Sequence, residues 1–153
     1  MSEHSDRAVE LFKSGYNCSQ SVFAAFCDKT GLPQETALRV AAGFGGGIGR
    51  MREVCGAVCG ATMLAGMVCG ATRGDDREAK ARTYEKVQEI ANRFRADKPS
   101  IICRELLGLS PCAAVVPTPE ARTESYYKKR PCVKLVEEAA LIAEAVLFSE
   151  EQE

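Results

Sequence analysis

The sequence lacks several features on which the more familiar cysteine chemistries depend. It contains a single histidine, His4, and no two cysteines in C-x-x-C spacing. The missing C-x-x-C argues against a thioredoxin-type motif, a zinc ribbon and a ferredoxin-type run. Because His4 lies in a terminus that we expect to fray, the chain also offers no histidine base for a Cys-His protease pair.

The sequence also lacks an excess of one charge and a secretory signal. Its 20 basic and 21 acidic residues are well mixed and give a formal net charge of −1. This balance argues against a nucleic-acid partner and against a polybasic membrane surface. The first residues contain no basic flank followed by an apolar run, so we expect a cytoplasmic protein whose thiols stay reduced.

Helical periodicity runs through nearly the whole chain, and no segment has the alternation of a strand. The length of 153 residues suits one domain with a substantial core, so cysteines are not needed as a disulfide scaffold. We therefore predict an all-α fold: a compact single-domain bundle of about six to eight helices over residues 1–153.

One uncharged run stands out as the centre of this bundle. Residues 54–71 are rich in Gly, Ala and Cys, with one Thr, one Leu and no Ile or aromatic residue. The run is near the length of a membrane span but only weakly apolar, so we expect a buried central helix from about Glu53 to Ala71 and no membrane insertion. Its two small-xxx-small pairs, Gly56 with Gly60 and Gly66 with Gly70, should let neighbouring helices approach closely.

Glycine, proline and capping residues predict the limits of the other helices. A hinge at Ser14–Gly15 should separate a first helix from a second that Gly31 ends. The remaining helices are expected over about 33–42, 75–96, 100–108, 118–127 and from 131 to the end of the apolar pattern near 147.

Four of the eight cysteines are predicted to stand where a helix begins. Asn17 caps the segment that opens with Cys18, Pro131 precedes Cys132, and Cys103 and Cys55 open two further segments. A thiol in the first helical turn lies at the positive end of the helix dipole, so its pKa should fall from about 8.5 toward 7. The alternative is that these cysteines pack as small hydrophobic residues.

A glycine-rich loop precedes the central helix. Residues 43–50, GFGGGIGR, fit neither a P-loop nor a dinucleotide fingerprint. Their bare backbone N–H groups would nevertheless suit a small anionic ligand or a thiolate, with a tight packed turn as the alternative. The candidate ligand-binding residues are Gly45, Gly46, Gly47, Gly49 and Arg50.

These residues together resemble a known family. The string Cys55-Gly56-Ala57-Val58-Cys59-Gly60, with Cys18 before it and Cys103 and Cys132 after it, is similar to the CGAxxG-motif (C_GCAxxG_C_C) family of redox-active proteins. The resemblance spans residues 8–148 and places the four family cysteines on Cys18, Cys55, Cys103 and Cys132. It implies a small bacterial or archaeal protein with a redox role.

Three functions remain open at this point. The first is thiol-disulfide redox chemistry with Cys18, Cys55, Cys103 and Cys132 as catalytic residues and Cys59 as an auxiliary thiol. The second is a metal site, an iron-sulfur cluster or a structural zinc, held by the same four cysteines. The third is a helical interaction protein with inert cysteines. The cofactor, the redox partner or small-molecule substrate, and a homo-oligomeric state are not specified by the sequence.

Overall fold

The computed structural model describes residues 2–149, and over this range the chain is helical without a strand. One isolated bridge joins Val54 to Ile102. The all-α prediction is confirmed, with two four-residue helices among the nine α-helices of the described residues. Those are α1 (Glu3–Lys13), α2 (Cys18–Ala24), α3 (Cys27–Thr30), α4 (Gln34–Ala41), α5 (Gly56–Cys69), α6 (Arg77–Phe94), α7 (Cys103–Leu106), α8 (Glu124–Lys129) and α9 (Cys132–Leu147), with a 3-10 helix η1 (Ala42–Phe44).

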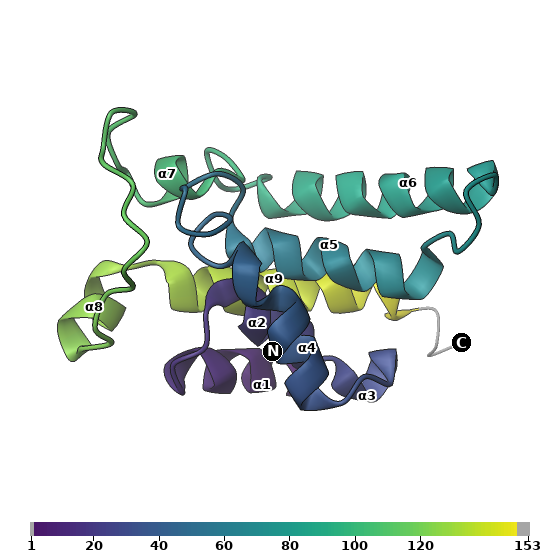
Figure 1. Ribbon diagram of the computed structural model, residues 1–153, viewed down its shortest axis with the longest axis horizontal. Helices are drawn as coiled ribbons and strands as arrows, with labels where there is room; N and C mark the ends of the chain where they lie inside the picture. The colour runs from purple at the N-terminus through teal and green to yellow at the C-terminus, as the bar shows by residue number, and fades with distance from the viewer. Residues whose placement is uncertain (1, 150–153) are drawn as a thin grey trace.

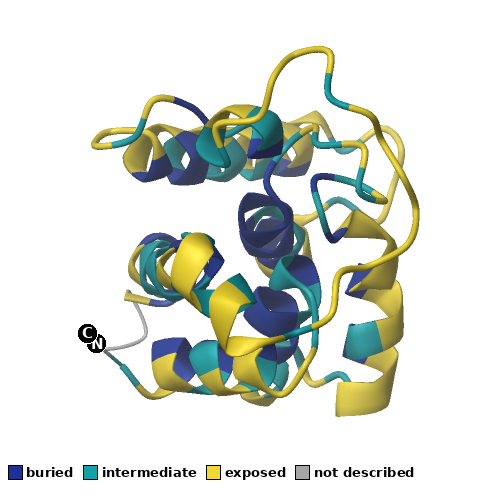
Figure 2. Cartoon of the chain, turned by 90° about the vertical axis from the view of Figure 1, so that its left-hand side faces the viewer, coloured by how far each residue is buried: buried dark blue, intermediate teal, exposed yellow. Residues whose placement is uncertain are grey.

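Helix α5 is the centre of the bundle, as the sequence predicts. It packs against α2, α6 and α9, and α1 packs against α2 and α9 on the other side (Figure 1). Its first turns are buried in the middle of the molecule (Figure 2). None of the described helices is long and apolar enough to cross a membrane.

The limits and the burial of α5 differ in part from the prediction. The helix begins at Gly56 rather than at Glu53, because Val54 pairs with Ile102 in the bridge. Its N-terminal half is buried, but residues 66–68 are exposed. The charge-free sequence therefore overstates how much of the helix other elements cover.

The two glycine pairs of α5 behave differently. A Cβ on Gly60 would lie 2.8 Å from the carbonyl oxygen of Ser19 and 3.0 Å from Cβ of Val22, and a Cβ on Gly56 would also meet α2. A Cβ on Gly66 would meet nothing within 4 Å. The first pair thus sits at a close helix contact, whereas the prediction for Gly66 is wrong.

Two predicted helices differ from the structure, although Gly31 does end the second one. The predicted second helix is interrupted between α2 and α3, where Phe26 turns into the core. The helix expected from Thr118 begins instead at Glu124, capped by Thr123, whose side chain accepts a hydrogen bond from the Tyr126 N–H. Residues 109–123 are irregular because long-range contacts hold them, including hydrogen bonds from Arg122 to the carbonyl oxygens of Phe12 and Tyr16.

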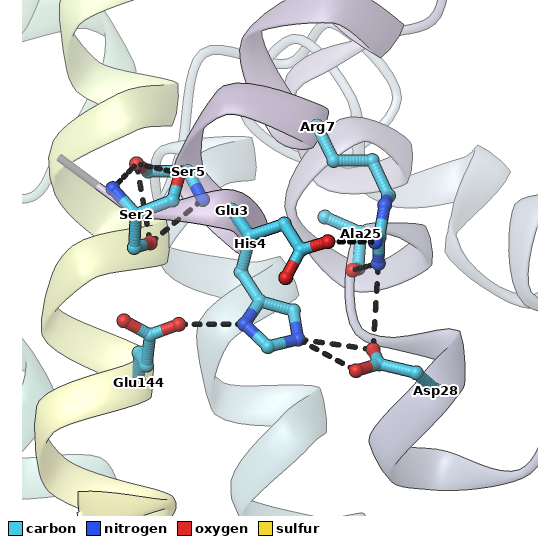
Figure 3. A network of polar contacts seen from close by, with 8 residues as sticks. All are labelled: Ser2, Glu3, His4, Ser5, Arg7, Ala25, Asp28 and Glu144. Atoms are coloured by element: carbon cyan, nitrogen blue, oxygen red, sulfur yellow. Dashed lines mark hydrogen bonds and ion pairs between the residues drawn. The ribbon is translucent and has the colours of Figure 1, made fainter.

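His4 is fixed in the fold, contrary to the expectation that it lies in a frayed terminus. Its ring stacks on Phe26 with 4.4 Å between centroids, and the residue is only 9% exposed. Nδ1 lies 2.5 Å from a Glu144 oxygen, and Nε2 lies 2.9 Å from an Asp28 oxygen (Figure 3). The capping box between Ser2 and Ser5 holds this end of α1 in place.

Candidate functional site

The structure brings together the four helix-start cysteines. Cys18, Cys103 and Cys132 are the first residues of α2, α7 and α9, and Cys55 is the N-cap of α5. All four line one cavity of about 60 Å³. The starts of α5, α7 and α9 lie toward the same end of the molecule, near α8 (Figure 1).

Backbone pairing and glycine packing hold these cysteines in position. The Cys103 N–H donates to the carbonyl oxygen of Glu53 at 2.6 Å, and the Cys55 N–H donates to that of Ile101 at 2.8 Å. A Cβ on Gly47 would lie 2.7 Å from the Cys103 Cβ, and one on Gly56 would lie 3.3 Å from the Cys18 Cβ. Both glycines therefore permit a contact that a larger residue would disturb.

Cys18 and Cys132 line the same cavity, and each shifts the pKa of the other. Hydrogen bonding with Cys18 is the main reason why the pKa of Cys132 falls to about 7. Burial opposes the shift, while the positive charges of Arg130, Arg122 and Arg52 favour it. The same hydrogen bond, together with burial, raises the pKa of Cys18 well above its ordinary value.

The other two thiols show that a helix start alone does not acidify a cysteine. Backbone N–H groups of Ala57 and Val58 bond to Cys55, but burial outweighs them and raises its pKa to about 12. Burial likewise raises the pKa of Cys103, although Arg52 donates to its sulfur at 3.7 Å. The expectation of a lowered pKa is therefore wrong for Cys18, Cys55 and Cys103.

The auxiliary thiol lies apart from this cavity. Cys59 is on α5, but its S–H contacts the carbonyl oxygen of Val54 at 3.7 Å, and burial raises its pKa to about 11. Cys69 is buried against the carbonyl oxygen of Ala65, and Cys112 is exposed in the irregular segment. A direct role of Cys59 beside the four cysteines thus lacks a geometric basis in this structure.

The glycine-rich loop forms a tight, conformationally unusual approach to the site. Gly46, Gly47 and Gly49 have φ values of 69°, 74° and 59°, a region that glycine readily adopts. Arg50 and Arg52 also have positive φ values of 62°, as does Ile48 at 64°. Such backbone is costly for residues with a Cβ and often accompanies functional sites, and here it directs Arg52 at Cys103.

This arrangement of cysteines in sequence is that of a known family. The pattern of the family described as "Putative redox-active protein (C_GCAxxG_C_C)" matches residues 16–146. The chain belongs to this family. The comparisons with curated proteins and with solved structures found no match.

For this member of the C_GCAxxG_C_C family, the sequence predicted a metal site held by four cysteines as an alternative to thiol chemistry. Among residues 2–149, no three His, Cys, Asp or Glu side chains are arranged so that they could hold a metal ion. A zinc or iron-sulfur site at Cys18, Cys55, Cys103 and Cys132 therefore stays a prediction from the sequence.

The family pattern also leaves out part of the site. Arg122, Tyr126 and Arg130 also line the cysteine cavity, and none of them was among the site residues predicted from the sequence. Arg130 directly precedes the Pro131-Cys132 helix start, so its position in the sequence could have predicted that it lies near Cys132. No pattern in the sequence predicted Arg122, because its position depends on contacts with α1 and the segment that follows α1.

Proposed function

We propose that the protein is a thiol oxidoreductase in which Cys132 attacks a disulfide and Cys18 resolves the mixed disulfide. The observation that supports this most is that Cys18 and Cys132 line one cavity with Arg52, Arg122 and Arg130, and that Cys18 and these arginines lower the pKa of Cys132. A thiolate with a pKa near the ambient pH combines availability with nucleophilicity. Cys132 therefore has the property that the attacking thiol needs.

In the first step, the Cys132 thiolate attacks one sulfur of a substrate disulfide. A bond forms between Cys132 and that sulfur, the substrate S–S bond breaks, and the other half leaves as a thiolate. Arg52, Arg122 and Arg130 are placed to stabilise this negative charge, because they already favour the Cys132 thiolate.

In the second step, Cys18 loses its proton and attacks the Cys132 sulfur. A Cys18–Cys132 disulfide forms, and the second half of the substrate leaves as a thiolate. The two leaving thiolates take up the two protons that the protein thiols release. The protein thus loses two electrons, the substrate disulfide gains them, and an external dithiol reverses the reaction to regenerate the protein.

Cys55 and Cys103 line the same cavity but have raised pKa values, so we assign them a supporting role. They stay protonated while Cys132 ionises, which keeps competing negative charge out of the cavity. Once the first disulfide has formed, either thiol can serve as a second site of exchange.

The test is to oxidise the reduced protein with bis(2-hydroxyethyl) disulfide and to map the products by mass spectrometry. The parent should lose two hydrogen atoms and yield one peptide in which Cys18 is linked to Cys132. Cys18→Ser should accumulate the mixed disulfide on Cys132, and Cys132→Ser should react much more slowly. Cys69→Ser serves as the matched control, because Cys69 is a buried thiol outside the cavity.

Two results would contradict this assignment. The first is a mixed disulfide that accumulates on Cys55 or Cys103 in the Cys18→Ser variant. The second is a stoichiometric amount of zinc or iron in anaerobically purified protein that is lost in each of the four single cysteine variants. The second result would favour the metal alternative.

A further inference from the structure

A second cavity opens beside the cysteines. Its volume is about 440 Å³, within the range of small-molecule sites, whereas the cysteine cavity has room for little more than a reacting group. The two cavities are neighbours, because they share lining residues. Those are Asn17, Gly46, Arg52, Arg122, Tyr126 and Arg130.

The lining of the larger cavity is strongly basic. It contains Arg50, Arg52, Arg122 and Arg130 but one carboxylate, Glu120, which leaves a formal charge of +3 in a chain whose net charge is −1. Such a concentration of one sign in a cleft attracts ligands of the opposite sign. The chain therefore gathers positive charge at the entrance to its thiols.

Most contacts of these arginines leave their charge uncompensated. Arg50 donates to the carbonyl oxygens of Val116 and Thr118, and Arg122 donates to those of Phe12 and Tyr16. These acceptors are neutral. The hydrogen bonds fix the guanidinium groups in place and leave their positive charge available to a ligand.

Glu120 shows what kind of group the arginines accept. One of its carboxylate oxygens is bound by Arg130 and lies 3.6 Å from Arg50 Nη2. The Glu120 side chain is 47% exposed, whereas those of Arg50 and Arg130 are 17% and 18% exposed. A carboxylate on an exposed, irregular segment thus contacts two well-covered arginines, from which an external carboxylate could displace it.

We infer that the substrate is a small disulfide that carries a carboxylate, with the carboxylate bound by Arg50 and Arg130 and one sulfur reaching Cys132. This inference rests on the proposed thiol chemistry and adds the class of substrate. Glu120 acts as an internal competitor that occupies the arginines when the cavity holds no anion. A substrate carboxylate replaces it and forms charge-assisted hydrogen bonds.

Three disulfides with two carbons on each side of the sulfurs provide the first test: 3,3′-dithiodipropionate, bis(2-hydroxyethyl) disulfide and cystamine. They carry two negative charges, none and two positive charges. Each rate with reduced protein is divided by the rate with free 2-mercaptoethanol, which removes intrinsic reactivity. The dianion should be favoured over the neutral compound by about tenfold, a factor that one charge-assisted hydrogen bond can supply. In 1 M salt, where screening acts within about 3 Å, the preference should shrink.

Variants connect this preference to the cavity. Glu120→Gln removes the internal competitor and should increase the dianion rate, whereas Arg50→Gln should decrease it. Arg82→Gln is the matched control, because it removes the same charge from an exposed position on α6 that lines neither cavity. The gain expected for Glu120→Gln keeps the test decisive if Arg50→Gln disturbs the segment that Arg50 anchors.

A binding measurement separates this inference from the proposed function. Octanedioate has the shape of 3,3′-dithiodipropionate without its sulfurs, and hexane-1,6-diamine corresponds to cystamine. By calorimetry, octanedioate should bind the Cys132→Ser protein and the diamine should not. Equal normalised rates for the three disulfides would overturn the inference and leave the thiol chemistry intact. Octanedioate binding without any disulfide reaction would overturn the disulfide substrate and leave the anion site.

Discussion

Cys18 and Cys132 line one cavity and shift each other's pKa, although they begin two different helices that are distant in the sequence. This interaction shifts their pKa values in opposite directions. The pKa of Cys18 is raised well above its ordinary value, and that of Cys132 is lowered to about 7. Two residues of the same type thereby acquire the two roles that disulfide exchange requires. The difference comes from the pair and from the arginines around it.

The first prediction concerns the alkylation of Cys132. In the reduced protein, iodoacetamide at pH 7 should label Cys132 well before Cys55, because the pKa of Cys132 is about 7 and that of Cys55 about 12. Cys18→Ala removes the partner whose hydrogen bonding lowers the pKa of Cys132, so that pKa should rise and the labelling profile should move to higher pH. Cys27→Ala, outside the cavity, should leave the profile unchanged.

Peptide mapping is needed because Cys112 is exposed and will also be labelled. Labelling of Cys55 before Cys132 would contradict the prediction and would restore the simpler idea that the helix start alone sets reactivity. A Cys18→Ala labelling profile identical to that of the parent would also contradict the prediction.

The second prediction concerns the pH dependence of stability. Between about pH 7 and 9 the folded protein has lost the Cys132 proton, while the unfolded chain still holds it, so stability should rise with pH. Above pH 9 the sign reverses, because Cys18 and Cys55 ionise in the unfolded chain and stay protonated in the folded one. Urea unfolding should therefore show maximum stability near pH 9.

Cys132→Ser is the diagnostic variant for this profile. It should abolish the rise between pH 7 and 9 and keep the decline above pH 9, because the raised pKa values of Cys55 and Cys59 persist. A parent protein whose stability falls steadily from pH 7 to 10 would show that Cys132 is not ionised in the fold.

The site shows which parts of its chemistry are local in the sequence. Helix starts could be predicted for Cys18 and Cys132, because Asn17 and Pro131 act on the residues beside them. The pKa values could not, because burial and the positions of Arg52 and Arg122 depend on the packing of distant segments. Cys55 is the clearest case, since its predicted helix-start contacts exist and burial still raises its pKa.

The third prediction concerns His4, which joins α1, α3 and α9. Burial would raise the pKa of the Asp28 carboxyl, but the hydrogen bond and charge of His4, with Arg7, lower it below its usual value. His4→Ala should raise the pKa of Asp28 and cost about 1–3 kcal/mol of stability at neutral pH. The stabilising effect on Asp28 is present above its unfolded pKa and is lost as pH falls through the lower folded pKa.

NMR titration of Asp28 and urea unfolding measure the two effects. Glu3→Gln is the control, because Glu3 is 88% exposed and pairs only with Arg7, at 3.9 Å, among the contacts of the described residues. It should change stability by less than about 0.5 kcal/mol. If the His4 and Glu3 variants have equal stabilities, the contacts of His4 with Asp28 and Glu144 in Figure 3 do not stabilise the packing of α1 against α3 and α9.

In the fold, as in the site, local features could be predicted from the sequence and features that depend on distant contacts could not. Periodicity predicted the helices, and the uncharged run predicted α5 as the central one, because each pattern reflects what a segment needs to bury. The position of His4 and the irregular course of residues 109–123 depend on Asp28, Glu144 and the arginine contacts. Those partners lie far away in the chain, so local patterns carry no sign of them.

The fourth prediction compares two glycines of the same helix. Gly60→Ala places a Cβ 2.8 Å from a backbone oxygen of α2, which cannot move without the helix, so it should cost about 1–3 kcal/mol. Gly66→Ala meets no atom within 4 Å and should gain up to about 1 kcal/mol from helix propensity. For a chain of this size, each kcal/mol corresponds to roughly 2–4 °C in Tm, so calorimetry should separate the variants clearly.

The same pair of variants tests whether packing sets the chemistry of the thiols. A Cβ on Gly60 would meet Ser19, the residue after Cys18, so pushing α2 away from α5 should weaken the effect of Cys18 on the pKa of Cys132. The labelling profile of Cys132 should then move to higher pH in Gly60→Ala and stay in place in Gly66→Ala. A Gly60→Ala protein that is destabilised but labels like the parent would show that the Cys18–Cys132 pair is held independently of the contact between α2 and α5.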